Sequence, residues 1–219
     1  MKLSKRLQAI YEMVPHGVAA DVGSDHGKLI ISLFQGGIIS KGYAIENKKG
    51  PYSRLCKEIE KSGVDHSIIP MFSDGISELP PDVDVVILAG MGGFNMIEIL
   101  KSHLNKLKNV KTIIVEANNA VPELRKQICK FGYIIADEDI VEDAGKYYEI
   151  IKFNVGECAY LDEPDYEFGP VLRNEKSLTF KEKYQSRIRE IDNLLSNKQL
   201  SNDRILDLDK EKERISKVL

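Results

Sequence analysis

The first 155 residues alternate short, β-rich apolar runs with longer segments of helical periodicity, and this alternation constrains the fold more than any other feature. The strand-like runs are bounded by glycine, proline, aspartate or serine, and they cover residues 17–23, 41–46, 67–72, 84–90 and 111–117. The helix-like segments between them cover residues 27–35, 50–62, 93–107 and 121–131. Strands and helices in this rhythm form βαβ units. The sequence therefore predicts a doubly wound α/β fold with a mostly parallel sheet and helices on both faces.

The last two strand-like runs, residues 133–143 and 147–155, follow each other without room for a helix between them. The intervening Ala144-Gly145-Lys146 suits a turn. Because only antiparallel strands can be joined by so short a connection, we expect the sheet to end in an antiparallel hairpin.

The pattern changes after residue 156, which we take as the end of a first domain over 1–156. An acidic stretch interrupted by proline and glycine predicts a linker over 157–172. In the remaining 173–219, apolar residues recur at steps of three and four over 175–198 and 203–219, with Ser201 or Asn202 placed to cap the second segment. Two amphipathic helices with a short connection predict an antiparallel coiled-coil hairpin.

Composition narrows the functional classes. The chain has 219 residues, 42% hydrophobic and 30% charged, with a net charge of −3, which argues against a strongly basic nucleic-acid binder but allows a local basic patch. No apolar run approaches the ~20 residues that cross a bilayer, and the N-terminus lacks the features of a signal peptide. The three cysteines and four histidines have neither disulfide-framework nor zinc-site spacing. We expect a cytoplasmic protein without a structural metal or a membrane partner.

The segment "AADVGSDHGKL", residues 19–29, joins the first strand to the first helix of the predicted sheet and places Asp21 and Asp25 around Gly23. Ligands of doubly wound folds bind beyond the carboxyl ends of the strands. A dinucleotide site would need G-x-G-x-x-G, but this turn lacks the middle glycine and carries an aspartate where a pyrophosphate would lie. Because two anions repel, the turn favours a cationic ligand without phosphate. S-adenosylmethionine, which carries a sulfonium and an amino group, fits this requirement.

The next three strand ends agree with that cofactor. Glu46 follows the second strand, where a carboxylate can accept hydrogen bonds from both ribose hydroxyls, and Asp74-Gly75 follows the third, where a polar group can meet the adenine. The fourth strand ends in the small-residue loop 89–93, which allows a planar substrate to approach. Each feature alone has a structural explanation as a helix cap, a solvated residue, an ordinary turn or a close-packing glycine. Together they mark four successive strand ends.

The segments "KLSKRLQAI", "ADVGSDHGKL", "ILAGMGG" and "GKYYEII", in this order, resemble the bacterial tRNA adenine-22 N1-methyltransferases, the TrmK family. "GPVLRNEKS" and the two terminal helices also match, so the resemblance covers nearly the whole chain. It implies a Rossmann-like class I methyltransferase domain followed by the coiled-coil hairpin. It also implies methyl transfer from S-adenosylmethionine to N1 of adenine 22 in tRNA.

The resemblance, taken with the strand-end pattern, gives a set of expected site residues. Those expected at the cofactor are Asp21, Gly23, Ser24, His26, Glu46, Asn47, Asp74, Gly75, Ala89, Gly90, Met91 and Gly92. Those expected at the tRNA are Lys2, Lys5, Arg6, Lys28 and Asn118. Asp25 is the expected catalytic residue, because a second carboxylate facing the substrate can stabilise the charge that develops on the adenine; the alternative is that it serves only the cofactor. The chain departs from the family at Lys28, where a tyrosine is expected, and at Glu116-Ala117, where Gln-Pro is expected.

Three other functions stay open at this point. A class I methyltransferase acting on a small molecule or on another RNA would use the same cofactor site, but a small-molecule enzyme would leave the terminal helices without a purpose. A nicotinamide-dependent dehydrogenase is disfavoured by the missing glycine pattern. A non-catalytic scaffold would not need carboxylates at successive strand ends. We expect a monomer, with dimerisation through the terminal helices as the alternative.

Overall fold

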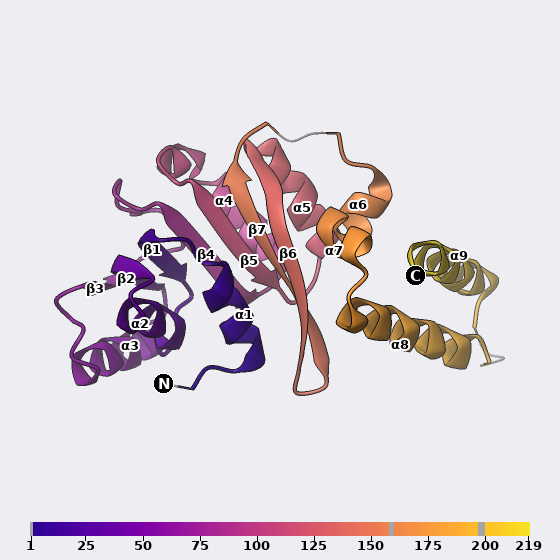
Figure 1. The fold of residues 1–219 in the computed structure, drawn as a ribbon, viewed down its shortest axis with the longest axis horizontal. Coiled ribbons are helices and arrows are strands. Elements are labelled where there is room, and N and C mark those ends of the chain that lie inside the picture. Colours follow the sequence, from indigo (N-terminus) through magenta and orange to yellow (C-terminus); the bar gives the residue numbers. More distant parts are fainter. Residues whose placement is uncertain (1, 158–159, 197–199) are drawn as a thin grey trace. The chain divides into compact units, whose positions relative to one another are not determined.

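The computed structural model describes residues 2–157, 160–196 and 200–219. The chain divides into two compact units, residues 1–160 and 161–219 (Figure 1). The division falls within the stretch that the sequence predicts as a linker.

The first unit is built on one seven-stranded sheet. Its strands are β1 (Gly17–Val22), β2 (Ile39–Glu46), β3 (Ile68–Phe72), β4 (Val85–Met91), β5 (Thr112–Ala117), β6 (Tyr133–Asp143) and β7 (Lys146–Val155). They are ordered β3-β2-β1-β4-β5-β7-β6. The strands from β3 to β5 are parallel, whereas β7 is antiparallel to both β5 and β6. The predicted parallel sheet with a terminal antiparallel hairpin is confirmed.

Helices cover both faces of this sheet. They are α1 (Lys5–Met13), α2 (Lys28–Gln35), α3 (Lys49–Lys61), α4 (Gly93–Lys101) and α5 (Val121–Lys130). Fully buried residues of α1, α2 and α3, such as Ile10, Leu33 and Leu55, share one core cluster with the strand residues Ile87 and Ile114. Helices α4 and α5 contact each other and lie behind the sheet in Figure 1. This arrangement leaves the carboxyl ends of β1 to β5 at one edge, where the connecting loops can form a site.

The helix predicted over 93–107 ends earlier than its leucine spacing indicates. Helix α4 stops at Lys101, and the backbone of His103, at φ −137° and ψ 41°, leaves the helical region before a short 3₁₀ turn, η1 (Leu104–Leu107). As a result Leu100 and Leu107 are buried but Leu104 is 44% exposed. The three leucines therefore do not share one helical face, because the change in backbone direction turns Leu104 outward.

The second unit begins with two short helices, α6 (Glu163–Phe168) and α7 (Pro170–Glu175). Helix α6 lies inside the stretch predicted as a linker, and α7 begins in that stretch and ends three residues after it. Asp162 and Asp165 form a capping box at the start of α6. Arg173 Nη1 lies 2.8 Å from Asp162 Oδ1 and 2.7 Å from Asp165 Oδ1. The acidic residues that suggested a solvated linker thus cap a helix and pair with an arginine.

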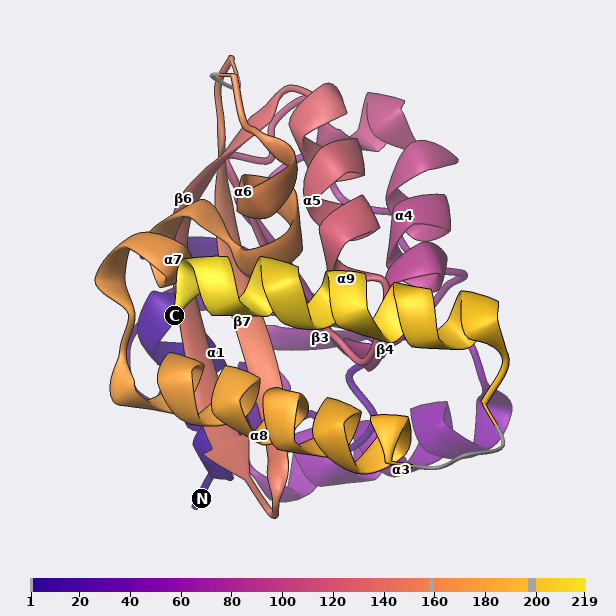
Figure 2. The same cartoon turned by 90° about the vertical axis from the view of Figure 1, so that its right-hand side faces the viewer.

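The two longer helices of the second unit, α8 (Leu178–Leu195) and α9 (Asn202–Val218), lie side by side (Figure 2). Ser201 caps α9 by accepting from the Arg204 N–H at 3.3 Å, as the sequence suggests. Arg187 Nε pairs with Glu211 Oε1 at 2.7 Å, and Lys212 pairs with Asp192. The chain runs in opposite directions along α8 and α9 (Figure 2); their coiled-coil packing stays a prediction.

Candidate functional site

The turn after β1 is fixed to the neighbouring strand by its backbone. The N–H groups of Gly23 and Ser24 both donate to the Ile45 carbonyl of β2, at 2.9 and 3.1 Å. Gly27 closes the turn in the left-handed conformation, at φ +66°, and α2 starts at the next residue. Asp25 also has positive φ, at +45°, which few residue types other than glycine, asparagine and aspartate adopt readily. The backbone therefore places the Asp21 and Asp25 side chains in different surroundings.

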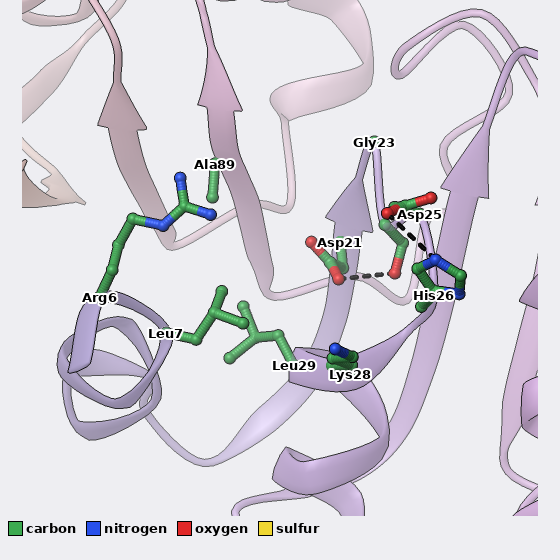
Figure 3. Close-up of a pocket in the computed structure, with 10 residues that line it drawn as sticks. Arg6, Leu7, Asp21, Gly23, Asp25, His26, Lys28, Leu29 and Ala89 are labelled. Carbon is green, nitrogen blue, oxygen red and sulfur yellow. Dashed lines mark hydrogen bonds and ion pairs between the residues drawn. The ribbon is translucent and has the colours of Figure 1, made fainter. Parts of the chain in front are cut away.

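A cavity of about 240 Å³, called the first cavity here, opens beside this turn (Figure 3). It is lined by Arg6, Leu7, Asp21, Gly23, Ser24, Asp25, His26, Lys28, Leu29 and Ala89. Eight of these residues were expected at the site from the sequence, and the structure brings them together. The apolar Leu7 and Leu29 were not expected, because nothing in a leucine distinguishes a cavity wall from the core beside it.

The two aspartates of the first cavity differ in their exposure to water. Asp21 is only 5% exposed and accepts a hydrogen bond from Ser24 Oγ at 2.6 Å. Burial raises the pKa of the Asp21 carboxyl to about 6, and the Ser24 hydroxyl opposes part of that rise. The Asp25 side chain is 62% exposed, with His26 Nε2 at 3.6 Å and Arg54 Nη2 at 3.9 Å from its oxygens. A buried carboxylate such as that of Asp21 favours a cationic neighbour, whereas the Asp25 carboxylate lines the first cavity and is largely exposed to solvent.

A second cavity, of about 300 Å³, lies on the other side of Gly23. It is lined by Val22, Gly23, Ile45, Glu46, Asn47, Lys48, Ser73, Asp74, Gly75, Met91, Asn95 and Ile99. Glu46 Oε1 accepts from the Asn47 and Lys48 N–H groups, both at 3.1 Å, and Asn47 Nδ2 donates to Asp74 Oδ1 at 2.9 Å. Within the described part of the chain, Glu46 Oε2 and Asp74 Oδ2 accept no hydrogen bond, so both oxygens are available to a ligand.

Gly23 lines both cavities, and its backbone conformation favours glycine. A Cβ atom there would lie 3.0 Å from Met91 Cε, and the backbone has φ +77°. Gly75, at φ +55°, is equally restricted, because its Cβ would lie 2.7 Å from Ile99 Cγ2. A single elongated ligand can therefore extend from one cavity to the other across the Gly23 backbone.

The end of β4 and the loop after it are held by side chains at and just beyond the end of β5. The Gly90 N–H donates to Glu116 Oε2 at 3.0 Å, and Asn118 Nδ2 donates to the Gly90 carbonyl at 2.9 Å. Gly92 precedes α4, next to Asn119, whose Oδ1 accepts from the Gly93 N–H at 3.1 Å. The structure thus places Asn118, expected at the tRNA, on the loop backbone. Neither Gly90 nor Gly92 is among the residues that line the two cavities.

The expected tRNA contacts are dispersed. Lys28 is exposed at the first cavity, whereas Lys2 is exposed ahead of α1 and Lys5 pairs with Glu142 at 3.4 Å. Arg6 lines the first cavity, but its Nη1 lies 3.1 Å from Glu116 Oε2. In the sequence, Glu116 stands out only as a departure from the family pattern. The feature of the sequence that could have located Glu116 is an acidic residue near the end of an otherwise apolar strand.

Metal sites, membrane spans and cysteines can be described for residues 2–157, 160–196 and 200–219. In those ranges no group of three or more His, Cys, Asp or Glu residues is placed to hold a metal ion. No helix in them combines the length and apolarity needed to cross a membrane. Neither Cys56 nor Cys129 forms a disulfide with another described cysteine, and Cys158 lies outside the described residues.

Comparison with known proteins identifies the family. The profile of the family described as "TrmK: tRNA (adenine(22)-N(1))-methyltransferase" matches residues 19–218. The chain is 32% identical over 196 residues to the tRNA (adenine(22)-N(1))-methyltransferase of Bacillus subtilis, covering 86% of this chain and 82% of the relative.

Solved structures agree over the whole chain. Sp1610 of Streptococcus pneumoniae in complex with S-adenosyl-L-methionine superposes with a TM-score of 0.92 at 33% identity, covering all of both chains. M. capricolum TrmK in complex with S-adenosyl-homocysteine gives a TM-score of 0.87 at 25% identity, covering 99% of this chain and 97% of that one. The fold of the first unit is the class I methyltransferase fold. The chain belongs to the TrmK family and is a tRNA (adenine(22)-N(1))-methyltransferase that depends on S-adenosylmethionine.

Proposed function

We propose that the chain binds S-adenosylmethionine across Gly23, with its nucleoside end in the second cavity and its amino acid end in the first, and that the methyl group passes to N1 of adenine 22 of tRNA beside Asp25. The observation that carries this proposal is the pair of cavities joined at Gly23 with carboxylates on both sides. A ligand with a ribose at one end and an ammonium group at the other matches this order of groups.

The residues of the second cavity fit a nucleoside. Two backbone N–H groups hold one oxygen of Glu46 and leave the other free, as an acceptor for two ribose hydroxyls requires. Asp74 likewise has one oxygen held by Asn47 and one free, which suits an adenine amino group. Gly75 allows the ligand to approach the backbone closely.

The residues of the first cavity fit the opposite end of the cofactor. Asp21 is buried, and its ionised form lacks a neighbouring cation: its only side-chain hydrogen bond within the described residues comes from Ser24. An ammonium group placed beside Asp21 supplies that missing charge and stabilises the ionised carboxylate. The pyrophosphate of a dinucleotide would instead add two anionic groups near Asp21 and Asp25.

Asp25 is the proposed catalytic residue. When bound, S-adenosylmethionine supplies a methyl group on a positively charged sulfur. N1 of neutral adenine has a lone pair, so the enzyme needs no strong base to expose it, and positioning provides much of the acceleration. As the adenine becomes cationic, the exposed Asp25 carboxylate in the first cavity stabilises the charge or accepts a proton from the exocyclic amine.

The tRNA is bound by local basic residues in this proposal, because the chain as a whole is acidic. Lys28 is the best placed, since it is exposed and lines the first cavity. Lys2 and Lys5 extend the basic surface ahead of and along α1. We also propose that the protein acts as a monomer in the cytoplasm.

The decisive experiment is methyl transfer from radiolabelled S-adenosylmethionine to an unmodified tRNA transcript, with a matched transcript that carries guanosine at position 22. We expect 1-methyladenosine in the first transcript and no label in the second. Equal labelling of both transcripts would place the target elsewhere. Tight binding of NAD by calorimetry, without binding of S-adenosylmethionine, would overturn the assignment of both cavities.

A further inference from the structure

Glu116 is a carboxylate buried at the reaction edge of the sheet, and neither cavity is lined by it. It stands near the end of β5 with a side chain that is 0% exposed. Only Oε2 is hydrogen-bonded: it accepts from the Gly90 N–H at 3.0 Å and from Arg6 Nη1 at 3.1 Å. Oε1 is buried and has no partner among the described residues.

Arg6 is the cation that compensates this carboxylate. Its guanidinium comes from α1, 110 positions away in the sequence, and stacks over the Tyr148 ring at 5.1 Å from the centroid. Burial raises the pKa of the Glu116 carboxyl, and Arg6 together with the Gly90 N–H opposes that rise. Without Arg6, an ionised Glu116 would be a buried charge without a counter-charge, which is strongly unfavourable.

Gly90 is the point at which this pair acts on the site. The β4–β5 register shifts between Ala89 and Met91, so the Gly90 peptide bulges out of the strand at φ +75°. Ala89 lines the first cavity and Met91 lines the second. Any rotation of the Gly90 peptide therefore displaces a wall of both cavities at once.

We propose that Arg6 and Glu116 are positioning residues for methyl transfer: Glu116 fixes the Gly90 peptide, and Arg6 keeps the buried carboxylate in place. The inference rests on the proposed function for its kinetic test, but the hydrogen-bond arrangement can be tested without catalysis. It replaces the expected role of Arg6 as a phosphate contact, because Nη1 is already bound inside the protein and the side chain is only 29% exposed.

The kinetic test uses Arg6→Ala, Glu116→Gln and the double variant. Glu116→Gln should stay within ~3-fold of wild type, because a single amide oxygen can accept both hydrogen bonds now made to Oε2. Arg6→Ala should lower kcat by ~10²-fold, as a misplaced site wall does, while KM for tRNA changes by less than ~3-fold. Adding Glu116→Gln to Arg6→Ala should restore at least ~10-fold of kcat, because the neutral amide needs no counter-charge.

A phosphate contact predicts a different outcome. Arg6→Ala would then raise KM for tRNA, with a weaker dependence on salt, and Glu116→Gln would rescue nothing. Either result would overturn the inference. If the wild-type protein methylates no tRNA at all, the proposed function fails. The positioning role of Arg6 and Glu116 is then tested by hydrogen exchange at the Gly90 amide, which does not depend on catalysis.

Hydrogen exchange at the Gly90 amide is measured in the ligand-free protein. We expect exchange to become at least ~10-fold faster in Arg6→Ala and to slow again in the double variant, since the amide opens when its acceptor moves away. Lys41→Ala is the control: it removes an exposed ion pair with Asp82 (2.9 Å) at the other edge of the sheet and should leave Gly90 unchanged. Unchanged Gly90 exchange in Arg6→Ala would contradict the inference.

Discussion

The two cavities that meet at Gly23 are built in different ways. In the second cavity the carboxylate of Glu46 is held by the backbone of the two residues that follow it, so the arrangement is local. The first cavity combines both signs of charge and includes Arg6, whose partner Glu116 is 110 positions away. The second cavity therefore depends on loop geometry and the first on the packing of α1 against the sheet. We expect changes in the second to affect cofactor affinity and changes in the first to affect turnover.

The largest expected effect is at Asp25 in the first cavity. Asp25→Asn removes the charge while keeping a residue type that tolerates φ +45°. The single-turnover rate at saturating substrates should fall by ~10²-fold or more, with the Kd for S-adenosylmethionine within ~3-fold by calorimetry. The exposed Asp65 offers a control, Asp65→Asn, that should change neither value. Equal losses in rate and affinity would mean that Asp25 serves only the cofactor.

The second-largest effect is expected at Glu46 and tests whether the second cavity determines cofactor affinity. Glu46→Gln replaces the free acceptor oxygen by a donor, so binding of S-adenosylmethionine should weaken by ~10- to 100-fold, the range for hydrogen bonds to a charged group. The rate at saturating cofactor should stay within ~3-fold of wild type. Glu60→Gln, an exposed change on α3, is the matched control. A Glu46→Gln protein with normal affinity but a slow rate would reverse the assignment of the two cavities.

A smaller effect concerns the pH dependence of Asp21. Its folded-state pKa of about 6 exceeds the ordinary value of 3.8, so the folded, ligand-free protein binds the proton more tightly than the unfolded chain. The Asp21 contribution to stability is therefore favourable at low pH and is lost as pH rises through about 6. An ammonium group needs the ionised form, so cofactor affinity should rise by ~10-fold between pH 5 and pH 7. In Asp21→Asn this rise should disappear; calorimetry at both pH values would show whether it persists.

The smallest effect is expected at Lys28, on the rim of the first cavity. Lys28→Ala should weaken tRNA binding by only ~3-fold near physiological salt, and the slope of log affinity against log salt should fall by about one. Lys130→Ala, a similar exposed change at the end of α5, should leave the slope unaltered. Titrations at several salt concentrations measure both quantities. An unchanged slope in Lys28→Ala would remove Lys28 from the phosphate contacts.

The sequence predicts the parts of the fold that follow from local patterns. The strand over 133–143 has the predicted bounds, and the other strands differ by one or two residues at one or both ends. The errors arise where backbone geometry overrides side-chain spacing. His103 interrupts a leucine repeat, and Asp162 caps a helix within an acidic stretch that lacks a clear apolar face.

In the candidate site, too, local sequence patterns predict some residues, whereas others depend on tertiary packing. Glu46 and Asp74 could be located from the sequence because each directly follows a strand, and strand ends meet at one edge of the sheet. The pairing of Arg6 with Glu116 could not, since it depends on how α1 packs beside β5, and no short-range pattern encodes a contact over that separation. The Asn118 side chain was expected at the tRNA, but its hydrogen bond to Gly90 arises from the bulge in β4, which leaves no mark in the sequence.

The shared wall at Gly23 has a consequence for inhibitor design. Two small compounds, one filling each cavity, would approach each other over a residue without a side chain, so a short chemical linker could join them. Tethering makes the second binding event intramolecular, and the joined compound gains from the high effective concentration of its other half. Fragment screens run separately against Glu46→Gln and Asp25→Asn proteins would sort the starting compounds by cavity.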